Sequence, residues 1–497
     1  AVKNGWTVKL VSSLASERAQ SVMAEGGINA ALNTKGEEDS PEQHYTDTLT
    51  AACGLADPNA VWGMTQAASE LVRSLHHLGV QFNVTDDDEL DLRNFGGQKK
   101  KRTAFAQSDT GKQLMTALID AVRREESAGT VERFPHHKFR TLLLSGNICG
   151  GCTVQDTYTG ELLRFVCDAV LIATGGLHGL FGDTTGSLAN TGEVTAELFR
   201  LGVPMANLEM IQYHPTTVEL GEKRMLLSEA ARGEGGRLFA LRNGKPWYFM
   251  EEKYPELGNL MPRDITAREV WTVSRDYEVF LDMTELPKEV MEHKLAGLVD
   301  DCQTYLHKDI RKEPIPILPG IHYFMGGIQV DERHRTSMRN LYAAGECCAQ
   351  YHGANRLGGN SLLGAIYGGQ IAAETACRET VSSPNMPCAE ESLLPELSPD
   401  AQMQMNRILL NALGVVRDAQ TLEAGIQEIR KLSGTLPLLG CAMLESALAR
   451  KESRGAHWRA DYPQRNDAVY CKTTVAHWNG QHIAISFESI PERRHDL

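Results

Sequence analysis

The sequence predicts an α/β protein. It contains a Rossmann-like domain that is incomplete at its N-terminus, an inserted α+β domain and a C-terminal helical domain. Three observations carry this prediction. Two short apolar strands, at 168–176 and 340–347, each run into glycine. A long segment richer in charged and aromatic residues separates them. Beyond a proline-rich stretch, the apolar residues change to a helical period.

The chain starts inside a nucleotide-binding unit. Residues 1–12 have the pattern of a helix end, a turn and the second strand of a βαβ unit. The first strand and the G-x-G-x-x-G turn that normally precede them are absent, and no substitute occurs later. Two interpretations stay open: the sequence is a fragment, or the pyrophosphate site has been lost. The intact motifs described below favour the fragment.

The two glycine-ended strands organise the middle of the chain. They are Asp168-Ala-Val-Leu-Ile-Ala-Thr-Gly-Gly176 and Asn340-Leu-Tyr-Ala-Ala-Gly-Glu-Cys347. In doubly wound folds, ligands lie outside the carboxyl ends of such buried strands, where glycine allows close approach. We therefore expect a nucleotide-binding domain formed by residues 1–207 and 320–380. The inserted domain then covers residues 208–319.

The C-terminal part has a different pattern. Four prolines between 384 and 399 predict a linker over residues 381–399. A separate helical domain is predicted for residues 400–497, because the apolar residues that follow the linker recur at helical spacing. They are Met405, Ile408, Leu409, Ala412, Leu413 and Val416, and then Leu422, Ile426, Ile429 and Leu432.

Composition excludes several classes of protein. The net charge is −14, and the single basic cluster, residues 99–102, is too short for a nucleic-acid groove. The eleven cysteines are scattered, which is typical of a reducing compartment. Their spacing matches neither a zinc nor an iron–sulfur site, so no metal site is predicted. No apolar run approaches the roughly 18–20 residues that span a bilayer, so the chain is not expected to insert into a membrane by itself.

Four motifs carry the candidate chemistry. They are Gln212-Tyr-His-Pro-Thr216; Ser228-Glu-Ala-Ala-Arg-Gly-Glu-Gly-Gly236 followed by Met261-Pro-Arg-Asp264; His322-Tyr-Phe-Met-Gly-Gly-Ile328; and His352-Gly-Ala-Asn-Arg-Leu-Gly-Gly-Asn-Ser-Leu362. Each alone has a structural explanation, since His-Pro is usually a turn and Glu-x-x-Arg is usually a helical ion pair. Together they supply histidines and arginines that suit a dianion, because the guanidinium fork matches a carboxylate.

In this combination and order, the motifs resemble the flavoprotein subunit of the succinate dehydrogenase/fumarate reductase family, a relative of L-aspartate oxidase. The likeness covers nearly the whole chain. Further matching segments are Ala24-Glu-Gly-Gly-Ile-Asn-Ala-Ala31, Asn94-Phe-Gly-Gly97, Asp109-Thr-Gly111, Ser453-Arg-Gly-Ala-His457 and Asp461-Tyr-Pro463. The resemblance implies an FAD-binding domain, a capping domain that closes over the substrate, and hydride transfer between FAD N5 and a small dicarboxylate.

The resemblance also implies roles for individual residues. Arg263 is the expected proton donor or acceptor, and Arg232 and Glu229 form its proton relay. The expected substrate-binding residues are His214, which also counts as catalytic, and His322, Arg356, Ser228 and Phe95. The expected FAD-contacting residues are Gln20, Ser21, Ala24, Gly26, Gly27, Thr174, Gly175, Gly176, Glu193, Glu346, Ser361 and Leu362.

Two departures from the family pattern sharpen the function. Membrane-bound members bond FAD covalently through a histidine, and Gln20 occupies that position here. We therefore expect non-covalent FAD and favour fumarate reduction as the working direction. L-Aspartate oxidases usually have a glutamate where this chain has Phe95, which cannot pair with an ammonium group. An amino-free dicarboxylate is therefore the expected substrate.

Three alternatives remain open. The first is an L-aspartate oxidase-like enzyme of NAD synthesis, and the second is a reductase of another enoate. The third is a degenerate subunit that serves only as a scaffold; the absent G-x-G-x-x-G turn favours it and the intact arginines and histidines oppose it. The resemblance further implies an iron–sulfur subunit and allows a membrane anchor, because this chain has no electron-transfer motif of its own. That predicts a cytoplasmic protein of anaerobic respiration, peripheral on the inner face of the cell membrane.

Overall fold

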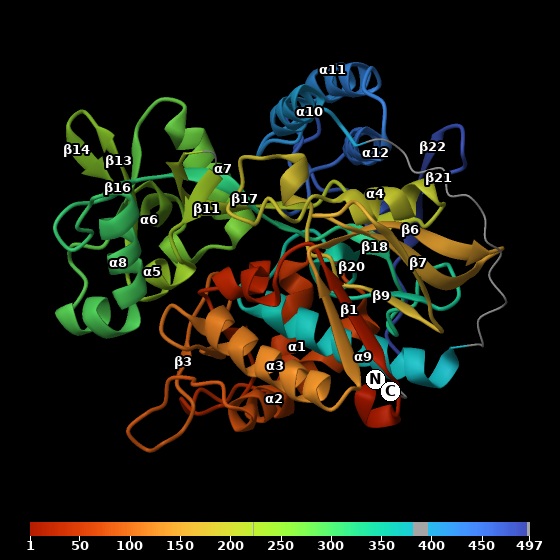
Figure 1. The fold of residues 1–497 in the computed structure, drawn as a ribbon. Coiled ribbons are helices and arrows are strands. Elements are labelled where there is room, and N and C mark those ends of the chain that lie inside the picture. Colours follow the sequence, from red (N-terminus) through yellow and green to blue (C-terminus); the bar gives the residue numbers. More distant parts are fainter. Residues whose placement is uncertain (222, 381–395, 495–497) are drawn as a thin grey trace.

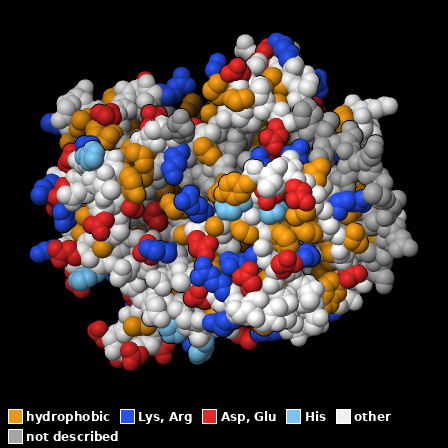
Figure 2. All heavy atoms as spheres, in the orientation of Figure 1, with side chains coloured by type: hydrophobic (Ala, Val, Ile, Leu, Met, Phe, Trp, Pro, Cys, Tyr) orange, Lys and Arg blue, Asp and Glu red, His pale blue; other side chains and the backbone are white. Residues whose placement is uncertain are grey.

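The computed structural model describes residues 1–221, 223–380 and 396–494. Figure 1 shows a central α/β region, a green region to one side that spans about residues 227–317, and blue C-terminal helices above the central region. On the face in Figure 2, Lys and Arg side chains alternate with Asp and Glu side chains. No helix in the described ranges is long and apolar enough to span a membrane.

The two glycine-ended strands predicted from the sequence are neighbours. Strand β9 (Val170–Ile172) pairs in parallel with β19 (Leu341–Ala343), so that their glycine-containing ends emerge at the same edge. The predicted N-terminal pattern is also confirmed. A short 3₁₀ helix (Val2–Asn4) ends at Gly5, and β1 (Val8–Ser12) pairs in parallel with β5 (Val131–Pro135).

The strand at 168–176 is less buried than its sequence predicts. Leu171 exposes 42% of its surface, and Leu10 of β1 exposes 39%. The reason is that β9 has only β19 as a neighbour among the described residues. Its other edge carries no partner strand there, so an apolar side chain that a central strand would bury faces outward.

Helices and small sheets surround these strands. Helices α1, α2, α3 and α9 gather on one side of the strands in Figure 1. They are Pro41–Ala51, Pro58–Leu78, Thr110–Ser127 and Asn360–Glu379. The antiparallel sheet β6-β7-β8 comprises His137–Ser145, Ile148–Asp156 and Leu162–Val166. A second small sheet contains β2 (Ile28–Asn29), β4 (Thr103–Ala104) and β3 (Leu92–Arg93).

The inserted region has a sheet and a core of its own. Its sheet, β14-β13-β15-β16, comprises Lys245–Trp247, Arg237–Arg242, Val279–Asp282 and Ile315–Pro316. Its helices α5, α6, α7 and α8 are Glu229–Gly233, Phe249–Lys253, Arg263–Ser274 and Ala296–Tyr305. A separate hydrophobic cluster runs from Leu227 to Ile317 and includes Phe95 from outside the insertion. An α+β insertion fits this arrangement, and its boundaries at 208 and 319 stay a prediction.

Two long strands connect the insertion to the rest of the molecule. Strand β11 (Ile211–Leu220) pairs antiparallel with β17 (Leu318–Phe324) and with β12 (Lys223–Leu226). The β11–β17 register shifts between His214 and Thr217. Such irregularities bend a strand and redirect its side chains, here beside two of the predicted site residues.

The prediction of a separate helical domain over residues 400–497 is wrong in two respects. Helices α10, α11 and α12 (Pro399–Ala412, Ala419–Ile429, Thr435–Ala449) form, but β21 (Lys472–Trp478) and β22 (Ile483–Ser489) follow them. Strand β21 joins a five-stranded sheet with β10 (Met205–Ala206), β18 (Gly327–Gln329) and β20 (Cys348–Ala349).

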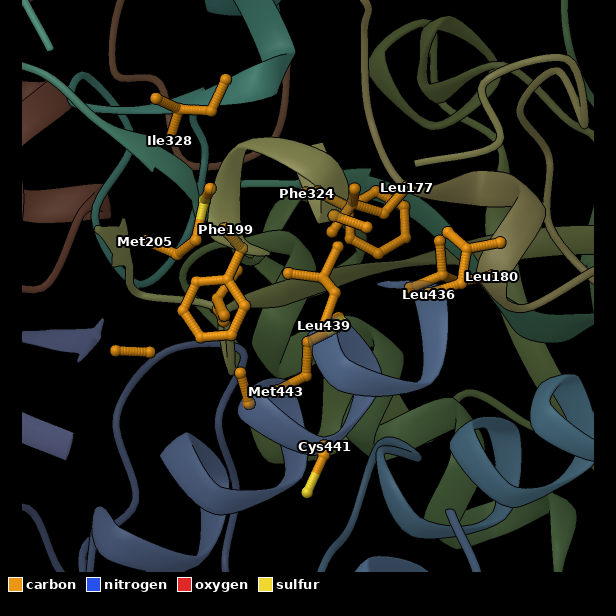
Figure 3. Packing of buried hydrophobic residues seen from close by; sticks show 14 of the residues in the cluster. Leu177, Leu180, Phe199, Met205, Phe324, Ile328, Leu436, Leu439, Cys441 and Met443 are labelled. Atoms are coloured by element: carbon orange, nitrogen blue, oxygen red, sulfur yellow. The ribbon is translucent and has the colours of Figure 1, made fainter. Parts of the chain in front are cut away.

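The helices also share the core of the central region. Leu436, Leu439 and Met443 of α12 pack towards Phe199 and Phe324 (Figure 3). An amphipathic helix buries its apolar face wherever a matching face exists, and here α4 (Glu193–Arg200) and the neighbouring strands provide it. The predicted linker, residues 381–399, overlaps α10 by one residue, because Pro399 is the first residue of that helix. Residues 381–395 of the predicted linker lie outside the described residues.

Candidate active site

Arg263, Glu229 and Arg232 form one buried cluster. Arg263 is the first residue of α7 and Glu229 is the first residue of α5, so each side chain extends from the first turn of its helix. Arg263 Nε donates to Glu229 Oε2 over 2.9 Å, and Arg232 Nη2 donates to Glu229 Oε1 over 3.1 Å. All three side chains are buried. The residues that the resemblance assigns to a proton relay are therefore in direct contact.

Gln212 is a fourth member that the sequence reasoning did not select. Its Oε1 accepts from Arg263 Nη1 over 3.1 Å. Its Nε2 donates to Asn355 Oδ1 and to the Arg356 carbonyl, both over 2.9 Å. Gln212 thus joins the start of α7 to the loop before α9. The available signal was its place two residues before His214 in the same motif.

His214 and His322 lie against each other from paired strands. Their ring centroids are 5.1 Å apart. His322 Nδ1 shares a hydrogen bond of 2.8 Å with the Thr185 hydroxyl. His214 Nε2 is buried and has no hydrogen-bond partner among the described residues. A buried imidazole nitrogen without a partner is costly, which fits a site completed by a ligand.

Arg356 is the third candidate carboxylate-binding residue. It is buried, and its guanidinium lies 4.2 Å from the ring centroid of Tyr323. Its Nε has no hydrogen-bond partner among the described residues. Burial, followed by the charge of Arg263, lowers the pKa of Arg356 to about 9. The tyrosine face fixes the plane of the guanidinium and leaves its donors available.

The charges of the site suit a dianion. Three buried arginines, Arg232, Arg263 and Arg356, are opposed by the single carboxylate of Glu229, whose pKa their charges lower despite its burial. Burial and the charge of Arg263 hold the pKa values of His214 and His322 well below the usual range, so both imidazoles are neutral. The net charge of about +2 complements a dicarboxylate.

Phe95 and Glu229 both lie close to Gly358. Its ring is only 1% exposed and belongs to the core of the insertion. A β-carbon added at Gly358 would lie 2.7 Å from Glu229 Oε2 and 3.0 Å from the Phe95 ring. At Gly96 it would lie 2.7 Å from Glu229 Oε1. These two glycines therefore allow the loops around Phe95 to close on the carboxylate.

Glycine-lined loops at the strand ends form a candidate nucleotide cradle. Gly27 has φ +135°, and a β-carbon there would lie 2.5 Å from the Ala104 carbonyl oxygen. Gly175 has φ +72°, and a β-carbon at Gly176 would lie 2.6 Å from Glu346 Oε1. Only glycine fits such positions, because neighbouring protein atoms occupy the space that a side chain would need, and the loops can therefore pack closely at the strand ends. The residues present fit a dinucleotide in this respect.

The other predicted FAD contacts come from several elements of the chain. Glu346 Oε1 accepts from the Phe324 N–H over 3.0 Å, and Thr174 is exposed just beyond β9. Ser361 and Leu362 lie in the first turn of α9, where free N–H groups favour an anion. The remaining contacts are placed as follows: Gln20 accepts from the Ser187 N–H, Ser21 lies in the short helix 20–23, Ala24 accepts from the Gly111 N–H, Gly26 packs on Phe95, and Glu193 opens α4.

Parallel strands that end in glycine and a buried arginine–glutamate cluster are the features that the resemblance predicts for a flavin-dependent oxidoreductase. A family model described as an FAD binding domain matches residues 1–362, and one described as the fumarate reductase flavoprotein C-terminus matches residues 433–494. The chain belongs to the succinate dehydrogenase/fumarate reductase flavoprotein family.

Individual relatives agree with this assignment. The chain is 38% identical to the succinate dehydrogenase flavoprotein subunit of Bacillus subtilis, covering 98% of this chain and 92% of the relative. It is 31% identical to the L-aspartate oxidase of Streptomyces coelicolor, covering 94% and 87%. Among solved structures, an E. coli quinol fumarate reductase is similar with a TM-score of 0.88 and 26% identity, covering 97% and 92%.

Proposed function

We propose that this chain is the catalytic flavoprotein subunit of an enzyme that interconverts fumarate and succinate, with fumarate reduction favoured. The observation that carries the proposal is the contact of Arg263 with Glu229 and Gln212 beside His214, His322 and Arg356. These groups form a buried, cationic site in which Arg356 Nε and His214 Nε2 have no hydrogen-bond partner among the described residues. Such a site binds two carboxylates and excludes water.

The residues of the chain divide the work. Arg356, His214 and His322 bind the carboxylates and hold the carbon–carbon double bond in place, which lowers the barrier by positioning. FAD, which the glycine-lined loops around Gly27, Gly175 and Gly176 would hold, would supply a hydride to one carbon of the double bond. Arg263 supplies the proton to the other carbon, which completes succinate. An isolated arginine rarely gives up its proton, so this transfer needs a relay that returns the proton to Arg263. Glu229 and Arg232 form that relay.

The cofactor is proposed to be non-covalent. Gln20 has no group that forms a histidyl–flavin bond, and its Oε1 accepts from the Ser187 N–H. We expect acid precipitation of flavin-loaded protein to release all the flavin into the supernatant. Flavin that stays with the pellet would show a covalent bond. Within the family, the missing covalent bond favours the reductive direction.

Electrons are proposed to arrive through a partner. An iron–sulfur subunit, and through it a membrane anchor, would place the chain at the inner face of the cell membrane. A similar solved structure supports this, since it is a quinol fumarate reductase with menaquinol molecules. We expect flavin-loaded protein alone to reduce fumarate with a reduced viologen dye. Failure of the loaded protein to form succinate would contradict the proposal.

L-Aspartate oxidation is the second candidate, because a relative of that name is 31% identical. Phe95 argues against it, since a buried phenylalanine beside Glu229 offers no partner to an ammonium group. We expect negligible hydrogen peroxide from L-aspartate under air. Robust peroxide formation would favour the oxidase. If the protein reduced another enoate faster than fumarate, that enoate would replace fumarate as the proposed substrate.

A further inference from the structure

Asn29 is a buried polar residue to which the proposed chemistry gives no role. It is the second residue of β2, and none of its surface is exposed. It follows Gly26 and Gly27, which are predicted FAD contacts, but its side chain faces a different segment. That segment is the loop 356–360, which leads from Arg356 to the first residue of α9.

Asn29 holds the loop 356–360 at three points. Its Nδ2 donates to the Gly358 carbonyl and to Asn360 Oδ1, both over 2.7 Å. Its backbone N–H donates to the Gly359 carbonyl over 3.1 Å. A side-chain amide has two protons, so Asn29 uses both of them on this one loop.

The oxygen of the Asn29 amide fixes the direction of these donors. Oδ1 accepts from the Thr103 hydroxyl over 2.6 Å and from Gln98 Nε2 over 3.0 Å. With two donors on the oxygen, only one orientation of the amide satisfies all of its hydrogen bonds. Gly359 has φ +82°, and a β-carbon there would lie 2.1 Å from Asn29 Oδ1, so only glycine lets the loop come this close.

The loop 356–360 touches the proposed active site at two places. Arg356 stands at its start, and the Arg356 carbonyl accepts from Gln212 Nε2 over 2.9 Å. Gly358 stands in its middle, where an added β-carbon would lie 2.7 Å from Glu229 Oε2. Gln212 therefore holds the loop on the side of Arg356, and Asn29 holds it on the side of α9.

We propose that Asn29 is a positioning residue for substrate binding: it fixes the loop 356–360 and thereby the place of the Arg356 guanidinium. The inference rests on the proposed function, in which Arg356 binds a substrate carboxylate. Arg263 is held separately, by Glu229 and Gln212. Loss of Asn29 therefore weakens the binding of substrate more than it slows proton transfer.

The test is Asn29→Ala in full-length, flavin-loaded protein. We expect the KM of fumarate with a reduced viologen dye to rise about tenfold, while kcat falls by less than about threefold. The dissociation constant of succinate, measured through the absorbance of bound flavin, should also rise about tenfold. A merely structural role gives the opposite result, since a smaller folded fraction lowers the apparent kcat and leaves KM unchanged.

A second variant and a matched control complete the test. Asn29→Ser keeps one donor, so its KM should lie between those of the wild type and Asn29→Ala. Asn59 is also buried, and its amide also binds two distant backbone groups, the Glu492 carbonyl over 3.1 Å and the Arg494 N–H over 2.8 Å. Asn59→Ala should melt at a lower temperature with an unchanged KM. If Asn29→Ala fails to fold, the comparison of Asn29→Ser with Asn59→Ala still decides.

The outcomes distinguish the two proposals. A KM and a succinate constant that stay within about twofold of wild type in the Asn29 variants, or that rise equally in Asn59→Ala, overturn the role of Asn29 and leave the proposed function intact. Loss of flavin with unchanged succinate affinity of the loaded fraction overturns that role as well. Succinate binding by the wild type without fumarate reduction overturns the function alone, because the succinate constants still test Asn29. Absence of succinate binding by the wild type overturns both.

Discussion

Arg263 is fixed at three of its nitrogen atoms. Nε and Nη2 donate to Glu229, and Nη1 donates to Gln212. A guanidinium held in this way has one plane and one direction available. At the residue scale, the orientation of the proposed proton donor therefore depends on Gln212 as much as on the relay.

Replacing Gln212 by leucine tests this dependence. The change removes one hydrogen bond to a charged group, which contributes about 1.5–3 kcal/mol, and we expect the kcat of fumarate reduction to fall by roughly 10- to 100-fold. Gln66→Leu, at an exposed position on α2, is the control and should be neutral. A Gln212→Leu protein with wild-type kcat would show that Arg263 is oriented without it.

The sequence predicted which side chains form the site better than it predicted the hydrogen bonds between them. Motif residues such as Arg263, Glu229 and Arg232 were found because their combination is specific, and the structure brings them into contact. Gln212 was missed because a lone glutamine has no spacing signal. Its importance comes from burial and from partners far away in the chain, which periodicity does not report.

At the element scale, the C-terminal strands had a recognisable pattern in the sequence. Ile483, Ile485 and Phe487 alternate with exposed residues in β22, which is the period of a strand. The helical prediction for residues 400–497 was wrong here because it extended the helical spacing of residues 405–432 to the end of the chain. The two glycine-ended strands were predicted correctly as elements, but the exposure of Leu171 depends on which neighbours β9 has, and one strand does not reveal that.

Helix α12 should be part of one cooperative unit with the central region. Leu439 is fully buried in the shared core, so Leu439→Ala should cost about 2–5 kcal/mol. We expect a single thermal transition at lower temperature, measured by circular dichroism. Met403→Ala, at an exposed position of α10, should leave the transition unchanged. Two resolved transitions, with only one shifted, would restore the separate helical domain.

At the scale of the whole molecule, buried histidines link folding to pH. Burial lowers the pKa of six of them below the usual value of about 6.5. They are His44, with a pKa of about 3, His334, with a pKa of about 4, and His214, His322, His352 and His457. At these six positions the unfolded chain therefore binds more protons than the folded chain below pH 6.5, and their contribution to stability falls as the pH falls.

We expect the melting temperature to drop between pH 7 and pH 5.5. Each of these histidines lowers the free energy of unfolding by roughly 1.4 kcal/mol at pH 5.5, and the raised pKa of Glu25 offsets roughly 2 kcal/mol of the total, so the net fall is roughly 5 °C. His334→Gln should melt lower but with a weaker pH dependence. The exposed His482→Gln should follow the wild type. A melting temperature that is constant over this range would contradict neutral buried histidines.

The turnover of fumarate by an Arg263→Lys variant tests the central proposal most directly. Lysine keeps the positive charge but loses the fork that contacts Glu229 and Gln212. With flavin-loaded protein and a reduced dye, we predict that kcat falls at least about 100-fold while flavin content is retained. Arg275→Lys, at an exposed position at the end of the same helix, should behave as wild type. Fumarate reduction by Arg263→Lys at the wild-type rate would contradict the proposed role of Arg263.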